Sequence, residues 1–288
     1  MDAEERPRNT KEDAPAARIL LASTLTVHSD RALDRACMIA KSLDAELVAV
    51  HAVDPGILPE RYVMENIDSA RAFLQRELDD SVHCDGVRAS AEILLGTADE
   101  AIGKYAAENG IGLIVTGVSR DLNLTSAFSG TRIEKVVRTA HCPVLVVKRR
   151  ARVEYRKIVV ALDLQPASRH ALDFALRSFP SARFTILHAG ISEAAAGLVE
   201  DVVVSRCTAA GHPAPGTSGG PEIVIFPDQA ADAIQQEIMS IDPDLVVLGT
   251  HGRSGMARLF VGSVAGTLLE VLPHDTLIAR APMAGGAA

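Results

Sequence analysis

The sequence predicts an α/β protein made of two tandem copies of a doubly wound, parallel-sheet domain. Three observations support this fold class: an internal repeat, a regular alternation of β-branched runs with helical periods, and strands that are apolar on successive residues. The 288 residues are enough for about two domains. We place these domains at 1–150 and 151–288, and we expect residues 1–17, which are charged and small, to form a disordered tail.

The internal repeat sets the architecture. Residues 19–36 align with residues 158–175 at a constant offset of 139, and the later parts of the two copies align at an offset of 132. The second copy is therefore shorter, and the two copies diverge after the second strand. Self-similarity of this length indicates a duplicated domain. Matching pairs include Ile19/Ile158, Ser29/Ser168, Asp34/Asp173, His51/His188, Leu113/Leu245, Gly117/Gly249 and Gly130/Gly262.

Each copy is expected to contain five strands, with helices between nearly all of them. Runs such as 158–160 and 245–248 are apolar on successive residues, which favours strands covered on both faces and hence a parallel sheet. The expected strands are 19–22, 47–51, 89–94, 113–117 and 144–147 in the first copy, and 158–162, 184–189, 222–226, 245–249 and 276–279 in the second.

Polar residues mark the expected helix starts. Ser29 and Ser168 are predicted N-caps, because a side-chain oxygen at that position accepts a bond from a free helical amide. Thr131 is followed by Glu134 at the spacing of a capping box, and Ser263 occupies the equivalent place in the second copy.

Two stretches are expected to lack regular structure. Residues 148–152, Lys-Arg-Arg-Ala-Arg, are interpreted as the linker between the copies, with solvated basic side chains rather than a binding patch. Residues 211–221 are dense in Gly, Pro, Ser and Thr and predict a flexible loop. In the first copy the same region, 60–82, has the length and period of a full helix.

Composition excludes several function classes. The net charge is −8, the isoelectric point is about 5.6, and only 3% of residues are aromatic, which argues against a nucleic-acid partner. No apolar run approaches the roughly 18 residues that span a bilayer, and the first residues lack the apolar stretch of a signal peptide. We therefore predict a cytoplasmic protein with no membrane partner.

The four cysteines are scattered along the chain without metal-ligand spacing. At this density they are interpreted as buried or incidental thiols in a reducing compartment, without a disulfide framework. They are Cys37, Cys84, Cys142 and Cys207.

A glycine-rich segment carries the strongest functional signal. The segment Gly249, Thr250, His251 and Gly252 begins at the end of the fourth strand of the second copy. After nine intervening residues, Gly262 and Ser263 precede the apolar helix 264–272. Parallel sheets bind ligands beyond the carboxyl ends of their strands, and free amides at a helix N-terminus receive phosphate oxygens. Gly262 and Ser263 alone would favour a simple helix N-cap, but the complete motif favours a phosphate site.

Together with the strand ends Ala161-Leu162-Asp163 and Leu187-His188-Ala189, this motif resembles the universal stress protein family, specifically its tandem members. The resemblance covers roughly 18–148 and 156–281. It implies five-stranded parallel sheets of order 3-2-1-4-5 and an ATP site, with Mg²⁺ accompanying the nucleotide. By resemblance, adenine and ribose would be faced by Ala161, Leu162, Asp163 and Ala189, and ribose and phosphates would be held by Gly249, His251, Gly252, Gly262, Ser263 and Val264, with Arg253 as an additional phosphate contact.

The first copy departs from the family pattern. Thr24 stands where the second copy has Asp163, and Arg120 stands where it has Gly252, although Gly117, Gly130 and Thr131 remain. Loss of a carboxylate and of a turn glycine predicts a degenerate nucleotide site. Alternatively, the cationic side chain at 120 could serve another anion.

Single residues in the motif have simpler interpretations. Asp163 alone could be a loop carboxylate that caps a helix, and His188 and His51 are better explained as core or interface histidines. His251 lies in the glycine turn and could face the ligand or not. There is no GxSxG, no GxxxxGK[ST] and no histidine set with metal-ligand spacing, so no catalytic residue and no metal ligand are assigned.

The leading hypothesis is a cytoplasmic stress-response or regulatory protein that binds ATP in its second domain as a conformational or assembly ligand. The alternatives are a protein-interaction module without nucleotide and a slow ATP hydrolase. The resemblance also implies an internal pseudo-dimer, with 144–147 facing 276–279, and a further homodimer is a possibility left open. Pairing of these edges would cover two exposed strands.

Overall fold

The computed structural model describes residues 16–25, 30–56, 60–118, 132–189, 193–226, 231–250 and 263–281. The first half contains β1 (Arg18–Ala22), α1 (Asp30–Ser42), β2 (Glu46–Val53), α2 (Glu60–Asp80), β3 (Ala89–Leu95), α3 (Ala98–Glu108), β4 (Leu113–Gly117), α4 (Arg132–Thr139) and β5 (Val144–Val147). The second half contains β6 (Lys157–Ala161), α5 (Pro166–Ser178), β7 (Arg183–Ala189), α6 (Glu193–Ala210), β8 (Glu222–Phe226), α7 (Ala231–Ile241), β9 (Leu245–Thr250), α8 (Ser263–Val271) and β10 (Asp275–Arg280).

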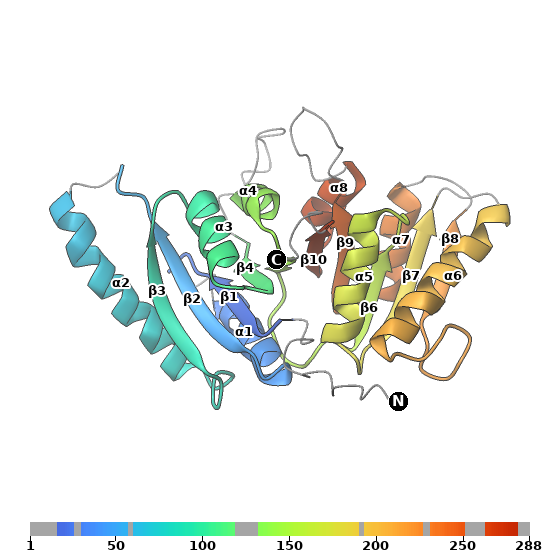
Figure 1. The fold of residues 1–288 in the computed structure, drawn as a ribbon, viewed down its shortest axis with the longest axis horizontal. Helices are drawn as coiled ribbons and strands as arrows, with labels where there is room; N and C mark the ends of the chain where they lie inside the picture. The colour runs from blue at the N-terminus through green and yellow to red at the C-terminus, as the bar shows by residue number, and fades with distance from the viewer. Residues whose placement is uncertain are drawn as a thin grey trace, which may run out of the picture.

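Every strand in the described ranges belongs to one sheet of order β3-β2-β1-β4-β5-β10-β9-β6-β7-β8. Within each half every pairing is parallel and the order is 3-2-1-4-5, so the predicted fold is confirmed. The halves meet where β5 and β10 pair antiparallel, at the centre of the molecule in Figure 1, with Leu145 opposite Leu277. The expected pseudo-dimer contact is therefore present, and it merges two sheets into one.

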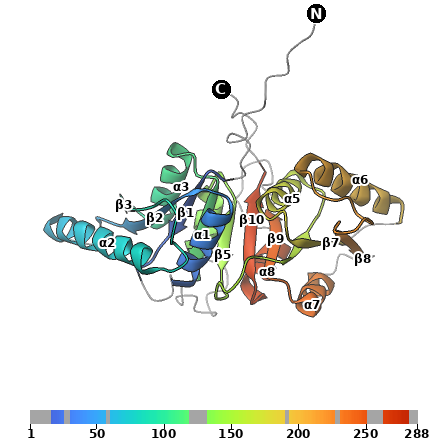
Figure 2. The ribbon, with the colours of Figure 1, turned by 90° about the horizontal axis from the view of Figure 1, so that it is seen from below.

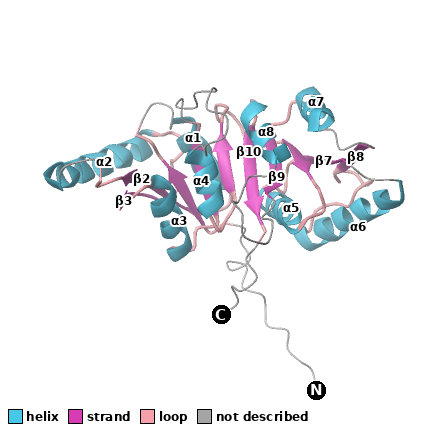
Figure 3. Ribbon diagram, turned by 90° about the horizontal axis from the view of Figure 1, so that it is seen from above, coloured by secondary structure: helices cyan, strands magenta, loops and turns pink. Residues whose placement is uncertain are grey.

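Helices cover both faces of the sheet, as Figures 2 and 3 show from below and from above. On one face, residues of α1, α2, α5 and α6 share a single apolar cluster that crosses the boundary between the halves. On the other face, α3 and α4 pack over the first half and α7 and α8 over the second, in two separate clusters. One cluster therefore spans both halves on the first face, whereas the second face has two clusters, of which the one over the first half also includes Ile278 of β10.

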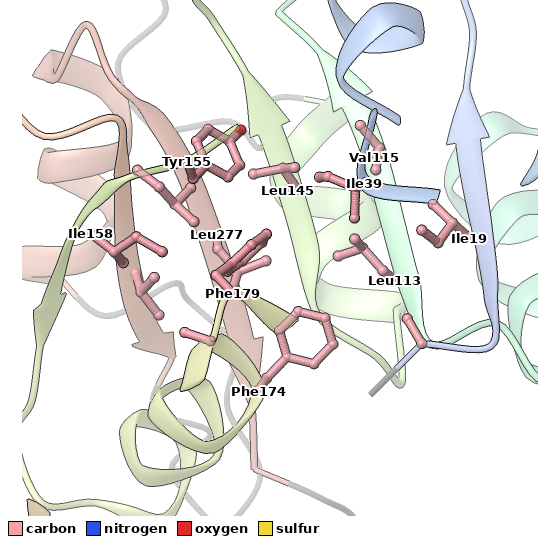
Figure 4. Packing of buried hydrophobic residues seen from close by; sticks show 14 of the residues in the cluster. Ile19, Ile39, Leu113, Val115, Leu145, Tyr155, Ile158, Phe174, Phe179 and Leu277 are labelled. Atoms are coloured by element: carbon pink, nitrogen blue, oxygen red, sulfur yellow. The ribbon is translucent and has the colours of Figure 1, made fainter. Parts of the chain in front are cut away.

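The shared cluster is centred on the two paired edge strands. Leu145 lies between Ile39 and Val115 of the first half and Tyr155 of the second, and Leu277 and Phe179 belong to the same cluster (Figure 4). The rings of Tyr155 and Phe179 pack edge to face with centroids 5.4 Å apart. Because apolar side chains of both halves are removed from water together, the halves are expected to unfold as one unit.

A buried polar network crosses the same boundary and is centred on Asp275, which is 0% exposed. Its Oδ1 accepts bonds from the backbone N–H groups of Lys148 and Arg149 at 2.7 and 2.8 Å, and its Oδ2 accepts one from the Tyr155 hydroxyl at 2.7 Å. Arg35 of α1 lies with Nε 3.6 Å from Oδ2 and stacks 4.0 Å over the Tyr155 ring. Burial and the neighbouring Asp275 charge raise the pKa of Tyr155 well above its ordinary value.

The linker differs from the expectation of solvated basic side chains. Lys148 Nζ donates to the carbonyl oxygens of Leu269 and Leu272, and Arg149 forms an ion pair with Asp242 at 2.8 Å. The expectation was wrong for these two residues because the antiparallel pairing of β5 with β10 places the linker directly beside the end of α8 and the start of β10.

The network is not repeated by the pseudo-symmetry of the chain. The repeat offset of 139 pairs Arg35 with Phe174, and the offset of 132 pairs Asp275 with Pro143. Phe174 is buried in the shared apolar cluster. The ion pair between Arg35 and Asp275 therefore has no ionic counterpart at the pseudo-equivalent positions.

The cysteines also differ from the expectation. Cys37 of α1 and Cys84, in the turn between α2 and β3, form a disulfide with Cα atoms 4.9 Å apart, although 47 positions separate them in the sequence. Ser81 of the same turn donates to Asp34 of α1 at 3.2 Å. The turn is thus tied to α1 by packing, which the sequence spacing does not reveal. Cys142 and Cys207 are free and buried, as expected.

This pairing predicts a defined alkylation pattern. In air-oxidised protein unfolded without reductant, we expect alkylation of Cys142 and Cys207 only, and after reduction we expect all four thiols to react, because a disulfide sulfur is not nucleophilic. Intact-mass measurement counts the adducts. A Cys84→Ser variant should show three adducts in both states, and four adducts on the oxidised wild type would refute the pairing.

The remaining expectations concern the tail, the loop and membranes. Residues 1–15 of the predicted tail lie outside the described residues, whereas Ala16 is buried in the shared cluster. The predicted loop at 211–221 follows α6 and contains Gly211, Gly216 and Gly219 with positive φ. Among the described residues no helix combines the length and the apolar character needed to cross a bilayer.

Candidate functional site

The candidate site lies at the carboxyl edge of the second half, where β6 separates β7 from β9. Ala161, the last residue of β6, is in register with Leu187 of β7 and Leu248 of β9. Leu162 and Asp163 follow β6, Ala189 ends β7, and Gly249 is the penultimate residue of β9. The topology therefore brings these five predicted residues to one edge, at the switch point that parallel sheets use for ligands.

The remaining predicted residues fall partly outside the described ranges. His251, Gly252, Arg253 and Gly262 are not described, so their predicted contacts stay predictions. Ser263 and Val264 form the first turn of α8. Ser263 is thus the first helical residue rather than the residue before the helix, and its backbone amide is one of those without an intrahelical acceptor.

Asp163 has a defined structural task. Its Oδ1 accepts a bond from the Ser168 hydroxyl at 2.5 Å and another from the backbone N–H of Gln165 at 3.0 Å. The backbone N–H of Asp163 in turn donates to Ser168 Oγ at 3.3 Å. This reciprocal arrangement fixes the turn that leads into α5, which supports the simpler interpretation of Asp163 as a loop carboxylate at a helix start.

The prediction of Ser168 as an N-cap was wrong. α5 begins at Pro166 with Gln165 in the cap position, so Ser168 lies inside the first turn. Proline is favoured at the first helical position because its fixed φ suits the helix and its missing N–H has no acceptor there anyway. For the first copy, α1 begins at Asp30, and the predicted cap Ser29 lies outside the described residues.

Gly249 is explained by packing between α5 and β9. A Cβ at this position would lie 2.3 Å from the backbone nitrogen and 2.5 Å from the Cα of Ser168, closer than any side chain could tolerate. The absent side chain allows the first turn of α5 to lie directly on β9. The glycine that the motif assigned to a ligand is therefore required by the fold itself.

His188 of β7 lies next to the candidate site, and the sequence analysis did not assign its polar ring to that site. Its Nδ1 bonds the carbonyl oxygen of Leu162, whereas its Nε2 is buried and has no partner among the described residues. A carbonyl only accepts, so Nδ1 carries a proton, and in the neutral ring Nε2 is then an acceptor. His51 makes the same bond to Ser23 at 2.9 Å in the first half, so this bond does not depend on a complete motif.

The helix α8 presents its N-terminus to the same edge of the sheet. Ala265, Leu268 and Leu272 are buried against Val246 and Leu248 of β9, which fixes one face of the helix on the sheet. Its first turn contains no acidic side chain. Positive partial charge from the free amides is therefore not neutralised by a neighbouring carboxylate of this turn, which suits an anionic ligand.

No cation site accompanies this edge in the described part of the chain. Across the described ranges, no group of three or more His, Cys, Asp or Glu side chains is arranged to hold a metal ion. In the first half, Gly117 ends β4 as predicted and Thr24 follows Ser23 in the position of Asp163, while Arg120, Gly130 and Thr131 lie outside the described residues.

Comparisons with known proteins all point to the same family. The profile of the universal stress protein family matches residues 16–148 and again residues 154–280. A universal stress protein of Methanocaldococcus jannaschii is 30% identical over 125 residues, which are 41% of this chain and 74% of that protein. One from Thermus aquaticus is 33% identical over 133 residues, which are 45% of this chain and 97% of that protein.

Solved structures agree over nearly the whole chain. A universal stress protein from Archaeoglobus fulgidus superposes with a TM-score of 0.71 at 17% identity and covers 93% of this chain and 99% of its own. A functionally unknown protein from Pseudomonas aeruginosa gives a TM-score of 0.62 at 21% identity, covering 94% and 95%. At these identities the likeness concerns the fold. The two profile matches span most of the sequence, so the chain belongs to the universal stress protein family and contains two copies of its domain.

Proposed function

We propose that the second half binds an adenine nucleotide, ATP, at the carboxyl edge formed by β6, β7, β9 and the first turn of α8. The observation that carries this proposal is the convergence of the strand ends Ala161–Asp163 and Gly249 with a helix N-terminus that bears no acidic side chain. Free amides at such a position bind phosphate oxygens, and the glycine spacing continues up to Ser263. Mg²⁺ would arrive with the phosphates.

The residues present are compatible with this ligand. The buried Nε2 of His188, which has no partner within the described ranges, is in the neutral ring an acceptor that a hydroxyl or amine of a ligand, or a water molecule, could satisfy. Asp163 would bind the ribose while its Oδ1 continues to accept the Ser168 bond that fixes the start of α5. The ligand would therefore stabilise the same turn that the fold already uses.

ATP is proposed to act as a conformational or assembly ligand in a cytoplasmic stress-response protein that can associate further into a homodimer. Phosphoryl transfer needs a residue that positions the nucleophile, and no such role is assigned to any residue. An interaction module without nucleotide and a slow ATP hydrolase are the competing functions, and binding and turnover measurements separate the three.

Thermal unfolding tests the binding proposal. ATP with Mg²⁺ at 100 times its dissociation constant should stabilise the protein by about 2.7 kcal/mol, equivalent to roughly 5 °C in Tm for a chain of this size. Absence of a shift at millimolar ATP would favour the interaction module. Mass spectrometry of small molecules released from the purified protein identifies a co-purified ligand independently.

A charge substitution locates the site. Ser263→Asp should abolish the ATP-dependent shift, because a carboxylate at the start of α8 repels phosphates, while the unliganded Tm should stay level or rise, since acids favour helix N-termini. The matched variant Thr131→Asp in the first half should leave the shift unchanged. If Thr131→Asp alone removes the shift, the nucleotide binds in the first half instead.

Turnover distinguishes a ligand from a substrate. We expect phosphate release to stay near background. Asp163→Asn is the suitable probe for the hydrolase alternative, because its amide oxygen can still accept the Ser168 and Gln165 bonds that hold α5. Turnover by the wild type that disappears in this variant while ATP binding persists would favour the enzyme.

A further inference from the structure

Lys148 connects the first half to α8, the helix whose first turn is proposed to bind the phosphates of the nucleotide. It is the residue after β5, and its Nζ donates to the carbonyl oxygens of Leu269 and Leu272 at the C-terminus of α8, the second at 2.7 Å. Leu269 lies in the last turn of α8, whose final carbonyls have no intrahelical donor, and Leu272 directly follows the helix. A side chain from the first half therefore caps a helix of the second.

The reciprocal contact exists across the same boundary. The repeat offset of 132 pairs Lys148 with Arg280, and Arg280 Nη1 donates to the carbonyl oxygens of Arg138 and Ala140 at the end of α4, the second at 3.3 Å. The same offset pairs Leu272 with Ala140. Each half thus sends one cation to the C-terminus of the last helix of the other half, and both copies of the domain retain the arrangement.

α8 depends on this cation more than α4 does. α4 has Arg138 in its last turn, whereas the last turn of α8 contains no basic residue and contains Glu270, whose charge opposes the negative end of the helix dipole. A helix of nine residues is marginal without tertiary contacts. In addition, Leu269 of α8 packs against the apolar cluster of the first half.

We propose that Lys148, which belongs to the first half, is a positioning residue for the nucleotide site of the second half. It holds the C-terminus of α8, so that the amides of the first turn of α8 stay aligned on the phosphates. This inference rests on the proposed function. It gives the first half a task in binding although its own motif is incomplete. Through Lys148, occupancy of the second half is coupled to the pairing of β5 with β10.

The charge of Lys148 is adjustable near neutral pH. Burial lowers its pKa to about 8, against the opposing effect of Asp275. Raising the pH through 8 should therefore remove the cation from the end of α8, while an arginine at this position would stay charged. Asp275 of β10 and His274, which precedes it, act on Lys148 electrostatically, and Arg31 of α1 donates to its carbonyl oxygen. The other charged groups near it are Arg149, which follows it in the linker, Arg35, which contacts the same Asp275, and Glu270 in the last turn of α8.

The experiment compares Lys148→Met, Lys148→Arg and Arg280→Met in the full-length protein, with Mg²⁺ and ATP as the titrated ligand. We expect Lys148→Met to weaken ATP binding roughly two- to tenfold, from the size of charge–dipole effects at helix ends, and Lys148→Arg to restore it. Arg280→Met should leave ATP affinity unchanged. Without ATP, hydrogen exchange of α8 amides should be faster in Lys148→Met, and that of α4 amides faster in Arg280→Met.

A pH series supplies a readout that loss of fold would not produce. Between pH 7 and 9, the ratio of the wild-type dissociation constant to that of Lys148→Arg should rise about two- to fivefold, and Lys148→Met should show no comparable step. A flat ratio, or equal ATP affinity of Lys148→Met and the wild type, would overturn the inference and leave the proposed function intact. Failure of the wild type to bind ATP would overturn the proposed function and the positioning role together, even if the exchange data confirm the cap.

Discussion

Replacing Asp275 by alanine should lower the free energy of unfolding by about 3–5 kcal/mol, the usual cost of removing one partner from a buried ion pair. The variant would leave the Arg35 guanidinium, 6% exposed in its side chain, without a counter-charge. It would also leave the Tyr155 hydroxyl and two linker amides without their acceptor. Because these groups come from both halves, the cost should appear as one cooperative transition shifted to lower stability.

Urea unfolding followed by circular dichroism measures this effect. Asp68→Ala on the exposed side of α2 is the control and should change stability by no more than about 0.5 kcal/mol. Arg35→Met combined with Asp275→Ala should be less destabilised than the sum of the single variants, since the double variant buries no isolated charge. A cost below about 1 kcal/mol for Asp275→Ala would show that the network does not hold the halves together.

The substitution Gly249→Ala should destabilise the protein by about 3 kcal/mol or more, at the upper end of overpacking effects. The added methyl group would meet the backbone of Ser168 at 2.3 Å, and a backbone cannot turn away as a flexible side chain can. Either α5 would lift from β9 or the end of β9 would bend. Both movements would disturb the turn in which Asp163 bonds Ser168.

Differential scanning calorimetry with and without ATP separates the two roles of this glycine. We expect the unliganded Tm to fall, which a residue that only contacts ligand would not cause. Gly197→Ala is the matched control, because nothing lies within 4 Å of its missing Cβ and α6 should gain slightly from alanine. An unchanged Tm for unliganded Gly249→Ala would contradict the packing role and would favour a role in ligand binding alone.

The features that could be predicted from the sequence are those encoded by residues close together in the chain. The strand Leu113–Gly117 agrees with the predicted bounds because a buried parallel strand is a continuous apolar run, a signal that lies within a few neighbouring residues. The half-exposed edge strand Glu222–Phe226 also agrees, because its β-branched run follows directly after the glycine- and proline-rich loop. The repeat likewise revealed the duplication, and the resemblance supplied the order of strands. Pairing of β5 with β10 followed from the same resemblance and is present.

Local signals were less reliable where two signals compete. Ser168 has the chemistry of an N-cap, but Pro166 starts the helix earlier, so the serine instead bonds Asp163 from within the first turn. At the candidate site the strand ends could be predicted. The burial of His188 Nε2 without a partner in the described part of the chain could not, because it depends on the side chains that the fold packs around it.

The sequence by itself determined that this protein is a duplicated α/β chain with a glycine-rich segment after the ninth strand, because periodicity, repetition and turn residues are encoded over short distances. Only the tertiary structure decided that Cys37 meets Cys84, that Asp275 is buried with Arg35 and Tyr155, and that Lys148 reaches α8. These contacts join residues 47 to 240 positions apart. No local pattern specifies such partners, since they depend on how the packed halves bring distant side chains into the same desolvated space.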